Sequence, residues 1–149
     1  PAILRLSEND FNKASSYIIE NILEPGQETI DNYKVSEMVI LSLYHEFIRL
    51  NSQNADYISE GLTLCRLLKD NLHLACIEGL SGGHIKYGEP EKEYLKALSF
   101  CGSNLLTDEE KEPCYKHILS RLRNWYSEDK SREICASVPG EYRGYCSQI

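Results

Sequence analysis

The chain of 149 residues lacks most of the motifs that would identify an activity. No apolar run approaches the ~18 residues that a membrane-spanning helix needs, so we predict no membrane span. No nucleophile motif, phosphate-binding loop or metalloprotease signature occurs either. We therefore predict no catalytic residue and no cofactor, and we favour a non-enzymatic role while leaving an enzymatic one open.

Signals for β-strands are also scarce, because the sequence contains no Asn-Gly or Asp-Gly turn and no sustained alternation of apolar and polar residues. Apolar residues instead recur every three to four positions, which predicts an all-α fold. In the first helix these residues are Phe11, Ala14, Ile18 and Ile22, with a possible cap at Ser7 and an end at Pro25-Gly26.

A second, unbroken amphipathic helix is predicted from Val35 to Leu50. Its apolar side carries Ile40, Leu43, Tyr44, Phe47 and Ile48, and its polar side carries Glu37, His45, Glu46 and Arg49. Shorter helices are expected at 55–68, 71–87, 90–102, 108 or 112 to 126, 129–137 and 140–147. Pro90 suits a first helical turn, and Pro113 favours a helix start near Glu112.

Positive charge is in deficit, with a formal net charge of −7. The average field of the chain therefore repels nucleic acid, and we predict no nucleic-acid partner. A basic strip of Lys116, Arg121 and Arg123 is too small to reverse this. Because the chain begins at Pro1 rather than Met, we expect a processed mature chain or an excised fragment.

The six cysteines include no C-x-x-C pair, and structural zinc sites need ligands two to four residues apart. We therefore predict no metal site. An even number of widely spaced cysteines is typical of disulfides, which form in oxidising compartments. We expect an extracytoplasmic protein, either periplasmic, secreted or in the secretory lumen.

Turn signals lie between successive cysteines. A capping box, Thr107-Asp108-Glu109-Glu110, separates Cys101 from Cys114, and Pro139-Gly140 separates Cys135 from Cys146. Between Cys65 and Cys76 the cap must come from Asp70 or Asn71. Each pair thus brackets a helical turn, which predicts disulfides 65–76, 101–114 and 135–146. Free thiols, or thiols cross-paired between helices as in twin-cysteine coiled-coil-helix proteins, remain the alternative.

The first cysteines of these pairs are 36 and 34 residues apart, which is close to the length of a helix-turn-helix repeat. Four residues before each one stands a small side chain, at Gly61, Ala97 and Ser131. Three repeats over 55–149 would follow a cysteine-free helical pair over 1–54 in a single domain. We expect stacked antiparallel helical hairpins in a solenoid-like arrangement.

This pattern resembles tetratricopeptide and Sel1-like repeats over roughly residues 57–149, especially secreted versions with a disulfide in each hairpin. The tryptophan, glycine and proline positions of the tetratricopeptide motif are not matched. The resemblance implies a stacked helical scaffold that binds a partner.

Three glycines, Gly79, Gly82 and Gly83, lie inside a predicted helix, where each costs about 1 kcal/mol relative to alanine. They indicate a close approach by a neighbouring helix, or by a ligand with His84 exposed nearby, or an early helix end. Histidines near the cysteines, such as His73 and His117, we assign to structural or surface roles.

Aromatic residues gather in the second half of the chain, and rigid rings are enriched at binding surfaces. The alternative is that they line contacts between repeats. The candidate binding residues are His84, Tyr87, His117, Arg121, Trp125 and Tyr126.

The function favoured by these observations is an interaction scaffold for a protein or peptide. One alternative is an enzyme with a site near His84 and His117. Another is a thiol redox or metal-handling protein, which requires a free cysteine pair. The sequence does not predict an oligomeric state.

Overall fold

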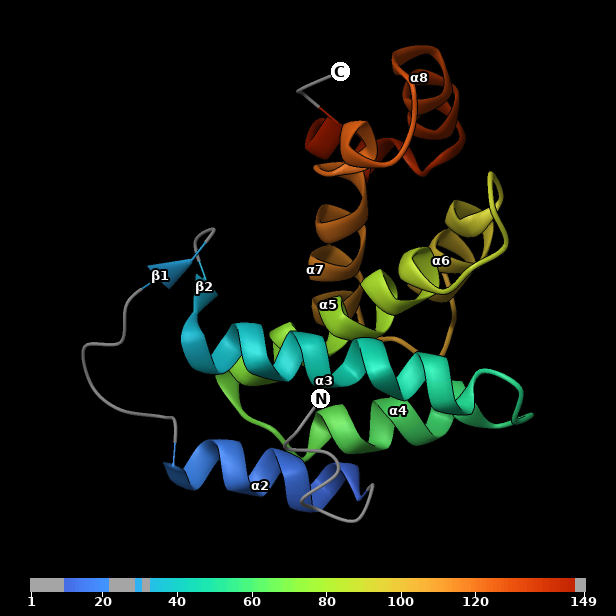
Figure 1. Ribbon diagram of the computed structural model, residues 1–149. Coiled ribbons are helices and arrows are strands. Elements are labelled where there is room, and N and C mark those ends of the chain that lie inside the picture. Colours follow the sequence, from blue (N-terminus) through green and yellow to red (C-terminus); the bar gives the residue numbers. More distant parts are fainter. Residues whose placement is uncertain (1–9, 22–28, 31–32, 147–149) are drawn as a thin grey trace.

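A computed structural model describes residues 10–21, 29–30 and 33–146, and this part of the chain is helical (Figure 1). The helices are α2 (Phe11–Asn21), α3 (Val35–Asn51), α4 (Tyr57–Arg66), α5 (Asp70–Lys86), α6 (Glu93–Cys101), α7 (Asp108–Leu119) and α8 (Glu128–Ser137), with 3-10 helices η1 (Leu122–Asn124) and η2 (Gly140–Cys146). Two-residue strands β1 (Thr29–Ile30) and β2 (Tyr33–Lys34) pair antiparallel. The all-α prediction is confirmed.

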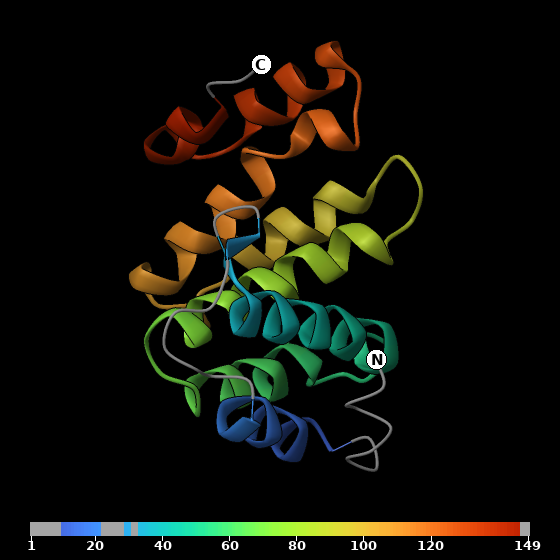
Figure 2. The same cartoon turned by 60° about the vertical axis from the view of Figure 1, so that its left-hand side comes forward.

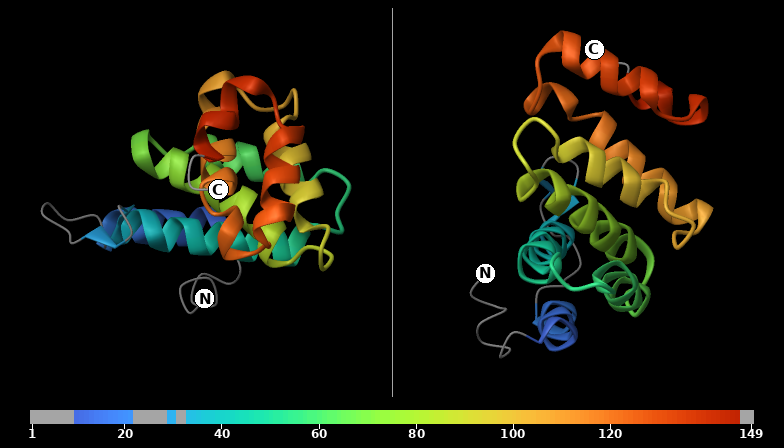
Figure 3. Two further views of the ribbon diagram at one scale, coloured as in Figure 1. Left: turned by 90° about the horizontal axis from the view of Figure 1, so that it is seen from above. Right: turned by 90° about the vertical axis from the view of Figure 1, so that its right-hand side faces the viewer.

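The helices are stacked along the long axis of the molecule, with α2 at one end and α8 and η2 at the other, and with α3 and α4 side by side next to α2 (Figures 2 and 3). Among the described helices, none has the length and apolar character to cross a membrane. The solenoid-like stacking of hairpins stays a prediction.

Helix α2 begins after Asp10, whose Oδ1 accepts a hydrogen bond from the Lys13 backbone N–H at 3.0 Å. The expected Ser7 cap, Ile22 and the Pro25-Gly26 stop lie outside the described residues. Helix α3 is unbroken, as predicted. It packs on α2 through Tyr44 and Phe47, whose rings lie 5.9 and 5.1 Å from the ring of Phe11.

Three disulfides join consecutive helices and confirm the predicted pairing. Cys65–Cys76 joins α4 to α5, Cys101–Cys114 joins α6 to α7, and Cys135–Cys146 joins α8 to η2. The Cα–Cα distances of 5.4, 5.4 and 6.4 Å lie in the range that a disulfide requires. No cysteine is free, and three intrachain disulfides are typical of an oxidising environment.

Helix α5 lies at the centre and contacts α3, α4, α6 and α7. Its glycines let α3 approach closely, because a Cβ at Gly79 would lie 2.6 Å from the Leu41 carbonyl oxygen and a Cβ at Gly83 would lie 2.8 Å from the Ile48 Cβ. Helix α5 continues through these glycines to Lys86. The expected close helix approach is therefore present, and the alternative of an early helix end is wrong.

The buried carboxylate of Glu110 ties α7 to α4 and α5. Its Oε1 accepts hydrogen bonds from Arg66 Nη2 at 2.8 Å and from the Thr107 backbone N–H at 3.0 Å, and its Oε2 lies 3.1 Å from His73 Nε2. The Thr107 Oγ1 accepts a bond from the Glu110 N–H at 3.3 Å. The predicted capping box is confirmed, and it also links two disulfide-bonded helix pairs.

Helix boundaries differ from the predictions near both prolines. Of the two predicted starts of helix α7, the one at Asp108 is confirmed and the one near Glu112 is wrong, because the Thr107 cap starts the helix and Pro113 is accommodated inside it. It ends at Leu119 rather than at 126, and η1 follows. Helix α6 begins at Glu93 rather than at 90, because Glu91 adopts a left-handed φ of 69° between Pro90 and the helix.

The turn between Cys65 and Cys76 is also made differently from the prediction. Asp70 breaks the helix by a left-handed backbone with a φ of 51°, and Lys69 occupies the N-cap position without a capping hydrogen bond from its side chain. The break is therefore in the backbone conformation and not in a capping side chain of Asp70 or Asn71.

We predict that mild reduction of the folded protein opens the Cys135–Cys146 bond before the other two. Cys135 is half-buried and Cys146 is 7% exposed, whereas the other four cysteines are 0% exposed. A thiolate must reach a sulfur atom to exchange with it. Alkylation after graded reductant, followed by peptide mass spectrometry, should label Cys135 and Cys146 first. Earlier labelling of Cys65–Cys76 or Cys101–Cys114 would contradict this order.

Gly79→Ala should destabilise the protein by about 1 to 3 kcal/mol, the range for overpacking, although alanine normally favours a helix. The added methyl group meets the backbone of α3, which cannot move without separating two helices. Urea unfolding with intact disulfides measures the effect. The control is Gly61→Ala in α4, where the methyl group meets only the side chains of Leu80 and Phe47, at 3.1 Å. Equal stability of the two variants would refute the constraint.

Candidate functional site

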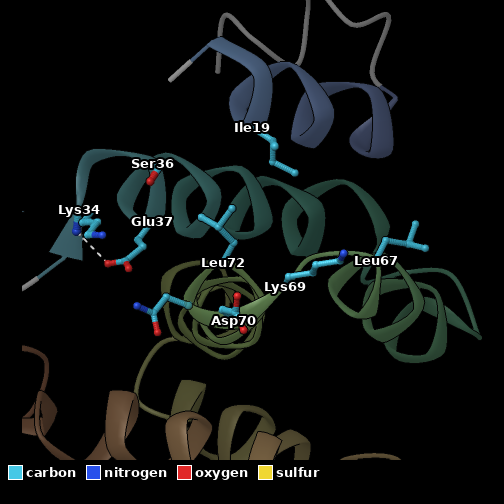
Figure 4. A pocket seen from close by; sticks show the side chains of 9 residues that line it. Ile19, Lys34, Ser36, Glu37, Leu67, Lys69, Asp70 and Leu72 are labelled. Atoms are coloured by element: carbon cyan, nitrogen blue, oxygen red, sulfur yellow. Dashed lines mark hydrogen bonds between the residues drawn. The ribbon is translucent and has the colours of Figure 1, made fainter. Parts of the chain in front are cut away.

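Two pockets are candidates for a functional site. The larger, of ≈ 570 Å³, lies beside the first turns of α3 and α5 and under α2 (Figure 4). Its lining consists of Ile19, Lys34, Ser36, Glu37, Leu67, Lys69, Asp70, Asn71 and Leu72. Of its carboxylates, Glu37 accepts a hydrogen bond at 2.8 Å from the Lys34 backbone N–H and so caps α3. This pocket contains no histidine, and its exposed rim is apolar at Ile19 and Leu67.

The second pocket, of ≈ 500 Å³, lies where α3, α5, α6 and α7 meet the end of η1. We call it the histidine pocket, and its lining residues are His45, Gly82, Ile85, Lys86, Glu93, His117, Asn124 and Trp125. It combines two imidazoles, an ammonium, a carboxylate and an indole ring that is 39% exposed. This concentration of polar chemistry beside an aromatic ring makes it the candidate site.

The two imidazoles converge on Gly82. A Cβ at that position would lie 2.5 Å from His45 Nε2 and 3.0 Å from His117 Nε2, so only glycine leaves room for both rings. On its other side the His117 ring lies with Nδ1 3.3 Å from the Glu78 carboxylate. His45 Nε2 is buried and has no hydrogen-bond partner among the described residues.

Burial is the main cause that lowers the pKa of His45 to about 4; the nearby His117 and Lys86 contribute in the same direction, and Glu46 opposes them. The His45 ring is therefore neutral at pH 7. The pocket thus holds a neutral imidazole beside a carboxylate-supported one.

Tyr126 positions the carboxylate of the histidine pocket. The Tyr126 hydroxyl donates to Glu93 Oε2 at 2.9 Å and accepts from the Tyr94 backbone N–H at 3.1 Å. Burial and the neighbouring Glu93 raise the pKa of the Tyr126 hydroxyl, so it stays a hydrogen-bond donor. Glu93 is therefore held in place by a buried partner.

The ammonium of Lys86 is at the rim of the histidine pocket. It lies 5.4 Å from the centre of the Tyr87 ring, and the Tyr87 hydroxyl donates to Glu46 Oε1 at 2.7 Å. A cation over a tyrosine ring is attracted by the negative face of the ring. Tyr87 thus connects the end of α5 to α3 beside the pocket.

Of the six residues proposed from the sequence for binding, five lie in or next to the histidine pocket. His117 and Trp125 line it. Tyr126 holds Glu93 and Tyr87 lies beside Lys86, as described above, and the Arg121 guanidinium lies 3.4 Å from the His117 carbonyl oxygen.

His84 is the exception, because it is buried rather than exposed. Its Nε2 lies 3.0 Å from the Tyr57 hydroxyl, its Nδ1 lies 2.8 Å from the Leu80 carbonyl oxygen, and its ring stacks on Phe100 at 5.3 Å. Two residues along a helix rotate by roughly 200°, so His84 faces away from the side of α5 that carries Gly82. The structure therefore does not bring His84 and His117 into one site.

His45 is not among the residues predicted for the site, because the helical pattern assigns it to the polar side of its helix. It follows Leu41 by four residues and precedes Ile48 by three, so it shares the helix face that contacts the α5 glycines. That spacing, together with the three glycines of α5, is the sequence signal that indicates a buried position for His45. No sequence signal of this kind identifies Lys86, Glu93 or Asn124, because tertiary contacts alone bring them to the pocket.

Comparison of the chain with models of protein families, with curated protein sequences and with solved structures finds no match. The interpretation of the site therefore depends on its geometry. Within the described part of the chain, no group of three or more histidine, cysteine or acidic residues is arranged to hold a metal ion.

We predict that His84 makes the stability of the fold depend on pH. Burial lowers its pKa from 6.5 to about 4, so the unfolded chain takes up a proton that the folded one does not. The stabilisation is complete above the unfolded pKa and is lost as pH falls from 6.5 toward 4. The slope is about 1.4 kcal/mol per pH unit at most for one proton.

Urea unfolding at pH 7, 6 and 5 should show this decline, to which His45 also contributes because burial lowers its pKa to about 4 as well. His84→Gln should therefore reduce the slope without abolishing it, whatever its effect at pH 7. The window stops near pH 5, because Glu110 and Glu46, whose pKa values are lowered, add their own loss below 4.5. An unchanged slope in the variant would contradict the assignment to His84.

Proposed function

We propose that the chain is a non-enzymatic interaction module that binds a protein or peptide in an oxidising compartment, with the histidine pocket as its contact site. The observation that carries the proposal is the exposed Trp125 ring beside fixed polar groups in a pocket of ≈ 500 Å³. Pockets of about 300 to 1,000 Å³ suit a small ligand or a few side chains of a partner. Tryptophan is among the residues that contribute most to binding energy at interfaces.

The similar placement of the cysteines in three successive helix pairs supports the proposal. Helices α4, α6 and α8, which carry the first cysteine of each disulfide, begin at Tyr57, Glu93 and Glu128, and each is followed by a helix that carries the second. The small residues four positions before those cysteines, Gly61, Ala97 and Ser131, are all buried. Stacked helical repeats such as tetratricopeptide and Sel1-like arrays, which this pattern resembles, present surfaces for partner segments.

Contacts within the protein already position polar groups of the pocket, and such preorganisation lowers the entropic cost of association. Glu93 is fixed by Tyr126, His117 is supported by Glu78, and the disulfides Cys65–Cys76 and Cys101–Cys114 constrain the helix pairs that carry these residues. A partner side chain entering beside Trp125 would therefore meet preformed polar groups. That arrangement favours specific recognition of one peptide segment.

The two alternative functions have less support. An enzyme built on His84 and His117 would need both rings in one cleft, and they face opposite sides of α5. A thiol-based redox or metal-handling protein would need an accessible free pair, and all six cysteines are bridged.

The test is selection of peptides from a random display library on the disulfide-intact protein, followed by affinity measurements with synthetic peptides. Trp125→Ala should weaken binding at least about tenfold, which corresponds to about 1.4 kcal/mol. The matched control is Leu105→Ala, which removes an apolar side chain that is 51% exposed and lies outside the pocket. That variant should bind like the unmodified protein.

Failure to enrich any peptide would count against a peptide-binding role. Peptides that bind equally well to Trp125→Ala would show that the contact surface lies elsewhere. Turnover of a selected peptide, seen as a change in its mass on incubation, would favour the enzymatic alternative.

A further inference from the structure

The convergence of His45 and His117 on Gly82 has the geometry of a pair of metal ligands. The distances of 2.5 and 3.0 Å from the same point mean that the two Nε2 atoms are at most 5.5 Å apart. Zinc binds imidazole nitrogen at about 2.0 to 2.1 Å, so one ion spans two nitrogens up to about 4 Å apart. At most a small rotation of the two rings would bring both nitrogens onto one ion.

The Glu78 carboxylate contacts the His117 ring in the way that carboxylates contact metal-binding histidines. Its Nδ1 lies 3.3 Å from Glu78 Oε2, which favours the tautomer with the proton on Nδ1 and the lone pair on Nε2. Such a carboxylate fixes the ring orientation and increases the basicity of the coordinating nitrogen. Glu78 lies on α5 and His117 on α7, so the packing of the two helices sets this contact.

His45 supplies the second observation. A buried polar atom without a hydrogen-bond partner is costly, and such atoms are explained by strain, by function, or by a bound water or ion. His45 Nε2 is such an atom, and the lone pair of a neutral imidazole satisfies itself either by accepting a hydrogen bond or by coordinating a metal. The neighbouring pocket provides space for further ligands, with Glu93 on its wall.

We propose that His45 and His117 together bind one transition-metal ion of the zinc and nickel class through their Nε2 atoms, with its other positions open to the histidine pocket. Imidazole ligands suit zinc, nickel and copper, whereas magnesium and calcium prefer oxygen. With two protein ligands, the ion would complete its coordination with water or with a group of the bound partner. This site is independent of the proposed peptide binding, because it requires neither a partner nor Trp125.

Titration calorimetry of the disulfide-intact protein with zinc chloride at pH 7.5 tests the site. We expect one ion per chain and at least tenfold weaker binding in His45→Gln and in His117→Gln. Glu78→Gln should weaken binding about tenfold or more, as loss of a supporting carboxylate does at metal-bound histidines. Magnesium chloride should give no heat.

The matched control is His73→Gln, which removes a histidine that also contacts a carboxylate, Glu110, but lies outside the pocket. This variant should bind zinc like the unmodified protein. Circular dichroism establishes that each variant is folded. If His45→Gln does not fold, zinc-induced shifts of the Nε2 resonances of His45 and His117 in the unmodified protein decide the question.

Absence of zinc binding would overturn the proposal. So would binding that survives both pocket substitutions, binding lost in His73→Gln, or zinc-induced shifts confined to other histidines. The zinc titrations test the metal site, and the peptide affinities test the interaction module. Peptide binding that persists in His45→Gln and His117→Gln would support the module whether or not zinc binds.

Discussion

The close approach of α3 and α5 is the constraint on which the rest of the structure depends. Gly79 and Gly83 remove the side chains that would collide with Leu41, Tyr44 and Ile48, so the two helices pack almost backbone to backbone. Three glycines in one helix lower its intrinsic stability by roughly 3 kcal/mol relative to alanine. Tertiary packing must offset that cost, and the central place of α5, in contact with four other helices, supplies it. Contacts with neighbouring helices thus stabilise α5 more than its own helix propensity does.

The same constraint creates the candidate site. Gly82 lies on the side of α5 where α3 and α7 both approach, and the space left by its missing side chain admits the rings of His45 and His117. A side chain at position 82 would force the His45 ring to shift, because its Cβ would lie 2.5 Å from His45 Nε2. Burial then keeps the pKa of His45 near 4, so a polar ring persists there in its neutral form. The close packing at Gly79 and Gly83 and the pocket at Gly82 are therefore consequences of one glycine-rich segment of α5.

Local features of the sequence predicted the local structure well. The capping box at Thr107 and the spacing of the cysteines each depend on contacts within about fifteen residues, and both are confirmed. Errors arose where the backbone departs from ordinary helix signals, as at Asp70 and Glu91, whose left-handed φ values no propensity indicates. The site was predicted in part, because aromatic clustering pointed to Trp125 and Tyr126 but could not show that α3 contributes His45. That contribution follows from a contact between distant segments, which helical periodicity alone does not encode.

Disulfides join the two helices of each pair, and noncovalent contacts join one pair to the next. Each disulfide spans only 11 or 13 residues, so it restrains a single pair of helices, by about 3 kcal/mol in the chain-entropy model. How one pair sits on the next is set by contacts such as Arg66 and His73 on Glu110, Tyr126 on Glu93, and the Tyr145 hydroxyl on Glu112 at 2.5 Å. The histidine pocket lies at such a junction, with walls from α3, α5, α6 and α7. An occupant would therefore act on the arrangement of the pairs, which noncovalent contacts control, while each pair keeps its covalent bridge.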